Sequence, residues 1–430
     1  MSAVATPPAG TDERRLLRSG RDGRSPTLAE HRSRYRRPPT PARRPERALI
    51  EVVSEAGLRG RGGAGFPTAR KLEAVAGRRG PRIVIANATE GEPASSKDRA
   101  LMNHAPHLVL DGAALAAAAV GASQIVVCID RADRRAVRSL RAAIAERTGE
   151  GGAAVELAET PSRYVAGEET ALVRFLNGGD AKPTHVPPRP FEKGVDGRPS
   201  LIQNVETLAH VAQIGSFGAA WFRQTGTPDE PGTTLVTVTG AVARPAVVEV
   251  PVGTQVRRIL ARAGGPAEPL AALLAGGFSG TWIPVAAGGT AAFSRAGLSQ
   301  LGASPGAGIL VALPAGACGL AETARILRWF AAESAGQCGP CVFGLADIAR
   351  TTAAIATGRA AAGDVERLRR WAGQIERRGA CRHPDGAVRL LRSALDVFAS
   401  DLDGHLGGRP CAAARGPGRL AVPETVAGWR

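Results

Sequence analysis

Apolar residues recur at two spacings along the chain, and the changes between them divide the sequence into parts. Between residues 82 and 157, short apolar runs alternate with longer stretches whose apolar residues return every three or four positions. Buried strands that alternate with helices are typical of a parallel sheet covered by helices. We therefore predict a Rossmann-like α/β domain with strands at residues 82–86, 124–129 and 153–157 and helices at residues 108–120 and 131–146.

Two other patterns follow this domain. Residues 235–250 form two apolar runs around a turn, and a helical pattern covers residues 254–263, so a hairpin and a helix are expected there. From residue 319 onward the spacing is helical, with Leu320, Ala324 and Leu327 on one face. Together with a last helix at residues 390–402, this region predicts a four-helix bundle.

The ends of the chain differ from its middle. The first 46 residues combine Pro, Arg, Ser and Gly without apolar periodicity, which predicts a disordered basic arm. A chain of 430 residues has room for several domains. We place their boundaries at residues 1–46, 47–232, 233–314, 315–413 and 414–430. The sequence has no apolar run of about 18 residues, so we expect neither a membrane span nor secretion.

The charge composition raises the question of nucleic-acid binding. The formal net charge is +16, but the basic residues are spread along the chain and aromatic residues make up only 4%. With so few aromatic residues to stack on bases, we expect no nucleic-acid partner. Nearly all cations are arginines, and the four lysines are Lys71, Lys97, Lys182 and Lys193. Two of these lie in the motifs described next, which favours a need for a compact ammonium group there.

The most informative stretch is the glycine-rich loop at residues 57–71, GLRGRGGAGFPTARK. Glycines let the backbone approach a ligand closely, and at positive φ their N–H groups can point together at a phosphate. Positive charge comes from Arg59, Arg61 and Lys71, and Phe66 with Pro67 supplies an apolar edge for a ring. A flexible surface linker is the alternative, but a linker needs neither the cations nor the Phe-Pro pair.

Two polar segments adjoin predicted elements of the sheet. Residues 87–99, NATEGEPASSKDR, follow the first strand directly, and ligands of open α/β sheets bind at the carboxyl ends of strands. In residues 164–177, Glu168 and Glu169 stand at the start of a predicted helix. Stabilisation of the helix N-terminus is an alternative role for these two carboxylates.

In this order, the motifs resemble those of the FMN- and NADH-binding flavoprotein subunit of respiratory complex I. That family includes the diaphorase subunits of NAD-reducing hydrogenases and formate dehydrogenases. The resemblance runs from about residue 47 to the tail and includes GEET at residues 167–170, QNVET at 203–207 and ESAGQCGPC at 333–341. It implies an FMN-binding domain, a soluble-ligand-binding β-grasp domain and a helical iron–sulfur domain.

The resemblance also implies roles for individual residues. Hydride would pass from NADH or NADPH to FMN, and electrons would then leave singly through an iron–sulfur cluster. Glu90 and Glu92 would lie around the nicotinamide and its ribose and serve catalysis. The cofactors would be held by Gly60, Arg61, Gly62, Gly63, Gly65, Phe66, Lys71, Asn87, Thr89, Gly91, Tyr164, Gly167, Glu168, Glu169, Gln203, Asn204 and Thr207.

Several positions depart from the family pattern. Thr89 replaces a carboxylate, and Gln203 replaces an asparagine that can form the same kinds of hydrogen bond. Ala74 and Arg189 stand where the family has aromatic residues that stack on adenine. FMN binding is therefore better supported than nucleotide binding.

The cysteine motif is one ligand short. Cys338, Cys341 and Cys381 match three of the family's four cluster ligands, while Ala335 occupies the first position. Thiolates suit iron–sulfur clusters, so these three are expected to hold a 3Fe-4S cluster or a 4Fe-4S cluster with an open corner. Zinc bound with His383 and complete loss of the metal site are the alternatives. Cys128 lies in an apolar strand pattern and is predicted to be a core residue, whereas Cys318 and Cys411 are predicted to be structural.

The expected partner is an electron-accepting iron–sulfur protein subunit. The chain is expected in the cytoplasm, at the inner face of the membrane if its partners belong to a membrane complex. The alternative function is a non-catalytic assembly or regulatory homologue that keeps the fold.

Overall fold

Four parallel strands, in the order β3-β2-β1-β4, form the sheet of the first domain. They are seen in a computed structural model that describes residues 14–18, 24–35 and 45–430. The three strands predicted from the apolar runs are confirmed, and a fourth joins them at the QNVET motif. Because all four are parallel, their carboxyl ends meet at one edge. The strands are β1 (Arg82–Ala88), β2 (Ala122–Asp130), β3 (Ala154–Thr160) and β4 (Ser200–Asn204).

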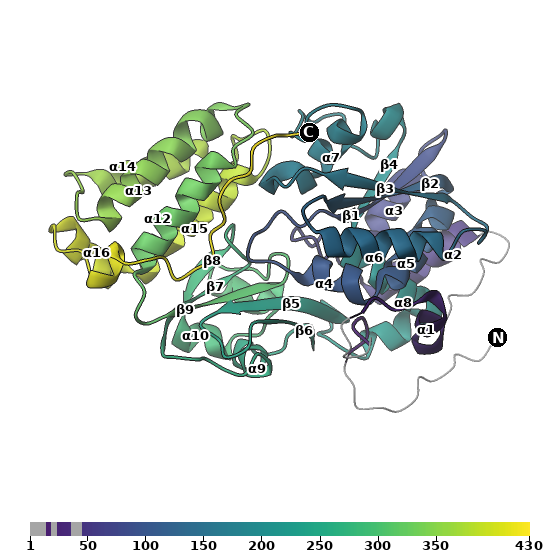
Figure 1. Ribbon diagram of the computed structural model, residues 1–430, viewed down its shortest axis with the longest axis horizontal. Helices are drawn as coiled ribbons and strands as arrows, with labels where there is room; N and C mark the ends of the chain where they lie inside the picture. The colour runs from purple at the N-terminus through teal and green to yellow at the C-terminus, as the bar shows by residue number, and fades with distance from the viewer. Residues whose placement is uncertain (1–13, 19–23, 36–44) are drawn as a thin grey trace.

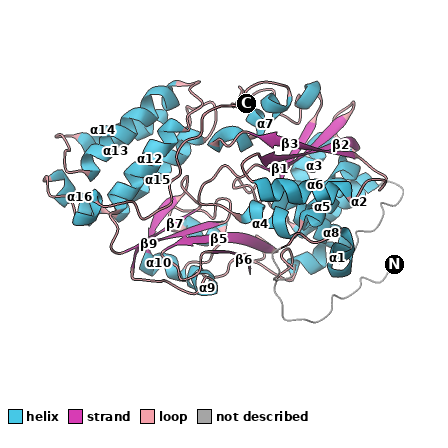
Figure 2. Ribbon diagram, in the orientation of Figure 1, coloured by secondary structure: helices cyan, strands magenta, loops and turns pink. Residues whose placement is uncertain are grey.

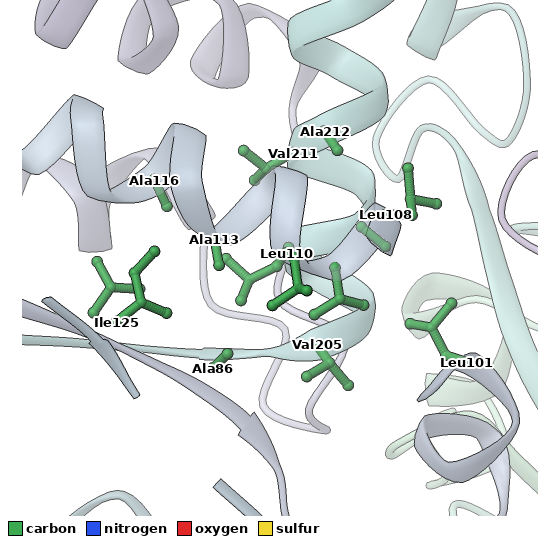
Figure 3. Packing of buried hydrophobic residues seen from close by; sticks show 14 of the residues in the cluster. Ala86, Leu101, Leu108, Leu110, Ala113, Ala116, Ile125, Val205, Val211 and Ala212 are labelled. Atoms are coloured by element: carbon green, nitrogen blue, oxygen red, sulfur yellow. The ribbon is translucent and has the colours of Figure 1, made fainter. Parts of the chain in front are cut away.

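Most helices of this domain cover one face of the sheet, where alternate strand residues such as Ala86 and Ile125 pack against them (Figure 3). A Cβ at Gly112 would lie 1.8 Å from the Leu208 carbonyl oxygen, so glycine is required where two of these helices meet. Cys128 faces the opposite side, as predicted for a core residue. The helices are α2 (Pro45–Ala56), α3 (Thr68–Ala76), α4 (Lys97–His104), α5 (Pro106–Val120), α6 (Arg134–Ala145), α7 (Glu169–Leu176) and α8 (Val205–Arg223), with short turns η1 (Tyr164–Gly167) and η2 (Val195–Gly197).

The prediction of a disordered arm over residues 1–46 is wrong for the stretches that the structure describes. The backbone N–H groups of Arg15, Leu16 and Leu17 donate to the carboxylate of Glu249 at 2.9 to 3.1 Å. Helix α1 (Leu28–Arg34) begins with a capping box formed by its N-cap threonine and Glu30. The rest of the predicted arm lies outside the described residues.

A second, mixed sheet has the strand order β6-β5-β9-β7-β8 (Figure 2). The predicted hairpin is confirmed as β5 and β6, and the helix after it as α9. One face of this sheet packs on α9, and the other packs on the C-terminal helices. The elements are β5 (Thr233–Gly240), β6 (Ala246–Pro251), α9 (Val256–Arg262), β7 (Leu270–Ala275), β8 (Thr281–Pro284), α10 (Val285–Thr290), α11 (Arg295–Ser299) and β9 (Ile309–Pro314).

From Gly319 to Leu406 the chain is helical, as predicted. Its last predicted helix is divided, because α15 ends at Val397 and the short helix α16 begins at Ala399. The chain then returns without strands to the first domain, where its end lies near α7 (Figure 1). The elements are α12 (Gly319–Ala332), η3 (Pro340–Leu345), α13 (Ala346–Ala356), α14 (Asp364–Ile375), α15 (His383–Val397), α16 (Ala399–Leu406) and η4 (Ala412–Arg415). Among the described residues, no helix has the length and apolar character needed to cross a bilayer.

Candidate functional site

Two polar segments meet at the carboxyl edge of the parallel sheet. The side-chain amide of Asn87 donates to the Gly167 carbonyl oxygen at 2.9 Å. A Cβ at Gly91 would lie 2.4 Å from the Tyr164 carbonyl oxygen, and one at Gly167 would lie 2.9 Å from that of Thr89. The glycines therefore permit the close approach of the loop after β1 to η1. The structure brings all five of these predicted residues together.

The glycine-rich loop lies on the junction between β4 and α8. The Arg61 N–H donates to the Thr207 hydroxyl at 2.9 Å, and a Cβ at Gly62 would lie 3.3 Å from the Asn204 Cβ. Positive φ values occur at Gly63, 108°, and Gly65, 63°, as the phosphate-loop hypothesis requires. The predicted loop and the predicted QNVET motif are thus one site.

The donors around this loop fit a phosphate. A small pocket is lined by Gly60, Arg59, Arg61 and Arg295, and also by the acidic residue Glu230. The Arg61 Nε is buried without a hydrogen-bond partner. Within the part of the chain that the structure describes, the N–H groups of Gly62, Gly63 and Gly65 donate to no protein acceptor. Unpaired donors and guanidinium groups are the chemistry that an anion needs.

Arg295 was not predicted as a site residue. It comes from α11 in the second domain, and its guanidinium donates to the Gly63 carbonyl oxygen at 2.6 Å. Its backbone N–H donates to Glu230 at 2.7 Å, which fixes the start of α11 beside the loop. No local sequence signal marks this arginine, because the contact joins segments more than 200 residues apart.

Three other predicted cofactor residues, Lys71, Glu168 and Glu169, already have protein partners. The Lys71 ammonium pairs with the Glu169 carboxylate and donates to the Ile202 carbonyl oxygen at 3.3 Å. Glu168 accepts from the N–H groups of Thr170 and Ala171 at 2.9 and 3.1 Å, so it is the N-cap of α7. Burial raises the pKa of Glu168.

Three further side chains complete the predicted set. Gln203 is buried with its Nε2 unpaired, so a donor is available at the end of β4. The Thr89 hydroxyl lies 3.2 Å from that of Thr160. Phe66 is 47% exposed, as expected for an apolar edge that contacts a ligand ring.

The two predicted catalytic carboxylates are not free in solvent. Glu90 accepts from the N–H groups of Asp98 and Arg99 at 3.1 Å each, at the start of α4, and it lines a pocket at the ends of β1 and β2. Glu92 is held by the Phe278 N–H at 3.0 Å, and its second oxygen is buried without a partner. Burial raises the pKa of Glu92 to about 7.

A buried charge network lies beneath the glycine loop. The Lys97 ammonium is 2.6 Å from Asp98 and 2.9 Å from Glu206, and it donates to the Asn204 side chain at 3.3 Å. Lys97 and Glu206 are 1% and 0% exposed. The scarcity of lysine in the sequence pointed to Lys97, but nothing local identified its partners.

The three motif cysteines converge. Cys338, Cys341 and Cys381 line one small pocket, and Ala335 and His383 line it too. The N–H-bearing Nε2 of His383 donates to the Phe330 carbonyl oxygen at 2.8 Å, while its Nδ1 is buried without a partner. Three thiols around one cavity fit an iron–sulfur cluster, and the alanine leaves one side without a thiol.

The loop that carries two of these cysteines is tied to η1, beside the carboxyl edge of the parallel sheet. Glu333 forms a buried ion pair with Arg163 at 2.9 Å and accepts the Tyr164 N–H at 2.9 Å. The Tyr164 ring packs edge-on against Trp329 and Phe330 of α12. The turn η1 therefore contacts the strand-end loop on one side and the cysteine loop on the other.

Three family models match the chain in this order. They are the Nuo51 FMN-binding domain at residues 53–213, the SLBB domain at residues 235–281 and the NADH-ubiquinone oxidoreductase-F iron-sulfur binding region at residues 321–405. The second F subunit of the NADH-quinone oxidoreductase of Rhizobium meliloti (strain 1021) is 35% identical over 378 residues, which cover 84% of this chain and 90% of that protein. The chain belongs to the family of NADH-quinone oxidoreductase F subunits. The resemblance in the motifs is confirmed.

Another F subunit and a solved structure also match this chain and support the family assignment. This chain is 32% identical over 382 residues to the F subunit of the NADH-quinone oxidoreductase of Streptomyces coelicolor (strain ATCC BAA-471 / A3(2) / M145). The match covers 84% of this chain and 84% of that protein. The crystal structure of an NAD+-reducing NiFe hydrogenase in its H2-reduced state matches with a TM-score of 0.79 and 34% identity. That match covers 84% of this chain and 63% of the hydrogenase chain. Like other F subunits, the chain is an NADH-dehydrogenase-type flavoprotein subunit with an FMN-binding domain and an iron–sulfur binding region.

Proposed function

We propose that this chain is the electron-entry subunit of an NAD(P)H-oxidising complex. When bound, FMN supplies the conversion of a two-electron hydride donor into one-electron steps. The observation that carries the proposal is the position of η1, which contacts the polar loop after β1 on one side and the loop of the three-cysteine pocket on the other. A chain that only bound nucleotide would not need a cysteine pocket so close to the flavin side.

Different groups of residues bind different parts of the cofactor and the nucleotide. The glycine loop, Arg61 and Arg295 hold the phosphate, because they offer unpaired N–H groups and positive charge. The polar ends of β1 and β4, with Asn87 and Gln203, hold the flavin's polar groups. Lys71 and the carboxylates Glu90 and Glu92 lie around the nucleotide and the cofactor beside it.

In the cysteine pocket, Cys338, Cys341 and Cys381 supply three thiolates to an iron–sulfur cluster. Since Ala335 offers no ligand, one corner is open to water or to the unpaired Nδ1 of His383. The buried pair between Arg163 and Glu333 fixes the loop that precedes the first of these cysteines.

The partner is an electron-accepting iron–sulfur protein, and an exposed apolar spot marks where it docks. Val342 and Phe343 follow Cys341 directly and are 44% and 71% exposed. Exposed arginines at positions 377, 378 and 382 flank Cys381. An apolar contact ringed by acidic residues is the surface that would complement this one.

Anaerobic purification followed by assays of FMN, iron and sulfide tests the cofactor assignment. We expect about one FMN and three to four irons per chain, with reduction of an artificial electron acceptor by NADH or NADPH. If the protein contains neither FMN nor iron after reconstitution, it is a non-catalytic homologue that keeps the fold. For the partner, Phe343→Ser should slow electron transfer to the physiological acceptor while leaving reduction of the artificial acceptor unchanged. An equal effect on both acceptors would contradict docking at this spot.

A further inference from the structure

A second group of metal-ligand side chains lies at the opposite end of α12 from the cysteine pocket. Cys318 precedes α12, His405 is in α16, and Cys411 follows α16. The cysteine loop begins after the other end of α12, and a helix of 14 residues is about 21 Å long, so the two groups are separate. Cys318 and Cys411 were predicted to be structural cysteines without a ligand role.

The distances within this group match a tetrahedral metal site. The ligand atoms of the three side chains all lie within 4.8 Å of one another, and the Cys318 Sγ is 3.7 Å from the His405 Nε2. Zn–S and Zn–N bonds of about 2.3 and 2.05 Å at tetrahedral angles put S and N about 3.6 Å apart, and two sulfurs about 3.8 Å apart. The side chains would need only small shifts to receive the ion.

The histidine is already oriented as a metal ligand. Its Nδ1 lies 3.2 Å from the Ile355 carbonyl oxygen, which can only accept, so the proton is on Nδ1 and the lone pair is on Nε2. A backbone carbonyl that fixes the tautomer in this way is the usual support of a zinc-bound histidine. The lone pair now accepts the Cys411 N–H at 3.3 Å, and a metal ion would replace that weak contact.

The surroundings also favour an ion with thiolate ligands. The Cys318 sulfur is at the N-terminus of α12 and accepts the Ala321 N–H at 3.3 Å. Burial raises the pKa of this thiol to about 12, and the Ala321 N–H opposes that rise, as a bound metal ion would. Cys318 and His405 are 2% and 1% exposed, while Cys411 is half-buried and leaves one side open to water. Two thiolates, one imidazole and a water are a known zinc ligand set.

We propose that Cys318, His405 and Cys411 bind a zinc ion whose fourth ligand is water. This assignment does not depend on FMN or the iron–sulfur cluster.

The ion would anchor the C-terminal segment. Beyond Cys411, the Arg419 N–H donates to Glu322 of α12 at 2.6 Å. The chain then crosses to the first domain (Figure 1). There the Arg163 guanidinium carbon lies 3.8 Å from the centre of the Trp429 ring. Zinc would thus fix the start of a segment whose end packs on the ion pair that holds the cysteine loop.

Metal analysis of the full chain tests the proposal. Protein purified under reducing, anaerobic conditions and dialysed against a mild chelator should keep about one zinc per chain, and X-ray absorption at the zinc edge should show about two sulfur and two nitrogen or oxygen neighbours. The Cys318→Ser/Cys411→Ser variant should lose the zinc and keep its iron. It should still fold, because serine is itself a good N-cap and Cys411 is half-buried. Loss of zinc should also speed trypsin cleavage at Arg415 and Arg419.

Matched variants separate this zinc site from the cysteine pocket. Cys128→Ala, in the core of the first sheet, should keep both metals, and Cys381→Ser should lower iron without changing zinc. Zinc that is lost with Cys381→Ser, or kept in the double variant, would overturn the proposal. So would absence of zinc after incubation with zinc chloride and a reductant. A Cys318–Cys411 disulfide in the reduced, anaerobic preparation would also overturn it.

Discussion

Lys97→Met removes the only cation that contacts both Asp98 and Glu206 in the described structure. Methionine keeps most of the volume of the lysine stem, so the change is electrostatic rather than steric. Both carboxylates are more than 90% buried and would lose the cation that contacts them. Breaking a buried ion pair by removing one partner costs about 3–5 kcal/mol.

The size of the effect can be checked from the pKa values. Burial, the larger influence, raises the pKa of Asp98 to about 6, so this group accepts a proton at little cost. Glu206 is different: despite burial, Lys97 and neighbouring groups lower its pKa to about 2. Without Lys97 it would have to be neutral, and protonating a carboxyl with a reference pKa of 4.5 at pH 7 costs about 3.4 kcal/mol, 2.5 units at 1.36 each. The cost of breaking a buried ion pair and the cost of protonating Glu206 therefore agree in magnitude.

The pH dependence follows from the same shifts. In the wild type, the pKa of Glu206 is below its unfolded value, so its contribution is present above pH 4.5 and is lost as the pH falls towards 2. In the variant, the folded-state pKa lies above 4.5, so protonation stabilises the variant as the pH falls. The difference in stability should therefore shrink between pH 7 and pH 5.

Thermal unfolding followed by circular dichroism and flavin fluorescence is the assay. For a domain of about 150–250 residues, each kcal/mol changes Tm by about 2–4 °C, so Lys97→Met should lower Tm by about 6–20 °C at pH 7. FMN affinity should fall as well, because Asn204, which Lys97 and Asp98 hold, contacts the glycine loop. The control is Lys193→Met at an exposed loop position. A Tm for Lys97→Met equal to that of the control would refute the reasoning.

Three further changes test the site. Lys71→Ala should lower FMN occupancy at unchanged Tm, because it removes the ammonium beside the glycine loop; unchanged flavin content and turnover would contradict this. Burial raises the pKa of Glu92 from 4.5 to about 7, so the wild type should lose about 3 kcal/mol of stability as the pH rises through that window, and Glu92→Gln should not. The same variant should weaken reduced-nucleotide binding and keep FMN, and release of FMN would contradict the role. Ala335→Cys should abolish the 3Fe-4S paramagnetic signal expected of air-exposed wild type, and a signal unchanged by the added thiol would refute the open corner.

The sequence predicted the centre of the sheet because its central strand, β1, is buried on both faces. Runs such as residues 82–86 then read as continuous apolar stretches, and β1 extends that run by two residues to Ala88. The ordered stretch around Arg15 could not be predicted in the same way. Its amides are held by Glu249, more than 230 residues away, and local composition carries no information about such a partner.

In the candidate site, too, local motifs could be predicted and contacts between distant segments could not. The glycine loop, the QNVET segment and the three cysteines were identified from local motifs, and the structure brings each set together. Their roles towards FMN, nucleotide and iron stay predictions. Arg295 was missed because only the packing of the second domain on the first places it beside the loop. The pairing of Lys97 with Glu206 was missed because it joins segments of the first domain that are more than 100 residues apart. His405 was missed because its spacing to Cys318, 87 residues, resembles no metal motif.

The departures from the family pattern occur where the fold tolerates them. Arg189 is exposed and Ala74 is half-exposed, so replacing aromatic residues there disturbs no core. Arg163 and Glu333 form a buried pair, and loss of either would leave an uncompensated charge inside the protein. Substitution at the exposed positions can change nucleotide affinity without changing stability, whereas the buried pair constrains both the fold and the cysteine loop. We therefore expect this chain to keep the geometry that links the flavin loop to the cysteine pocket and to differ from its relatives chiefly in how tightly it holds the nucleotide.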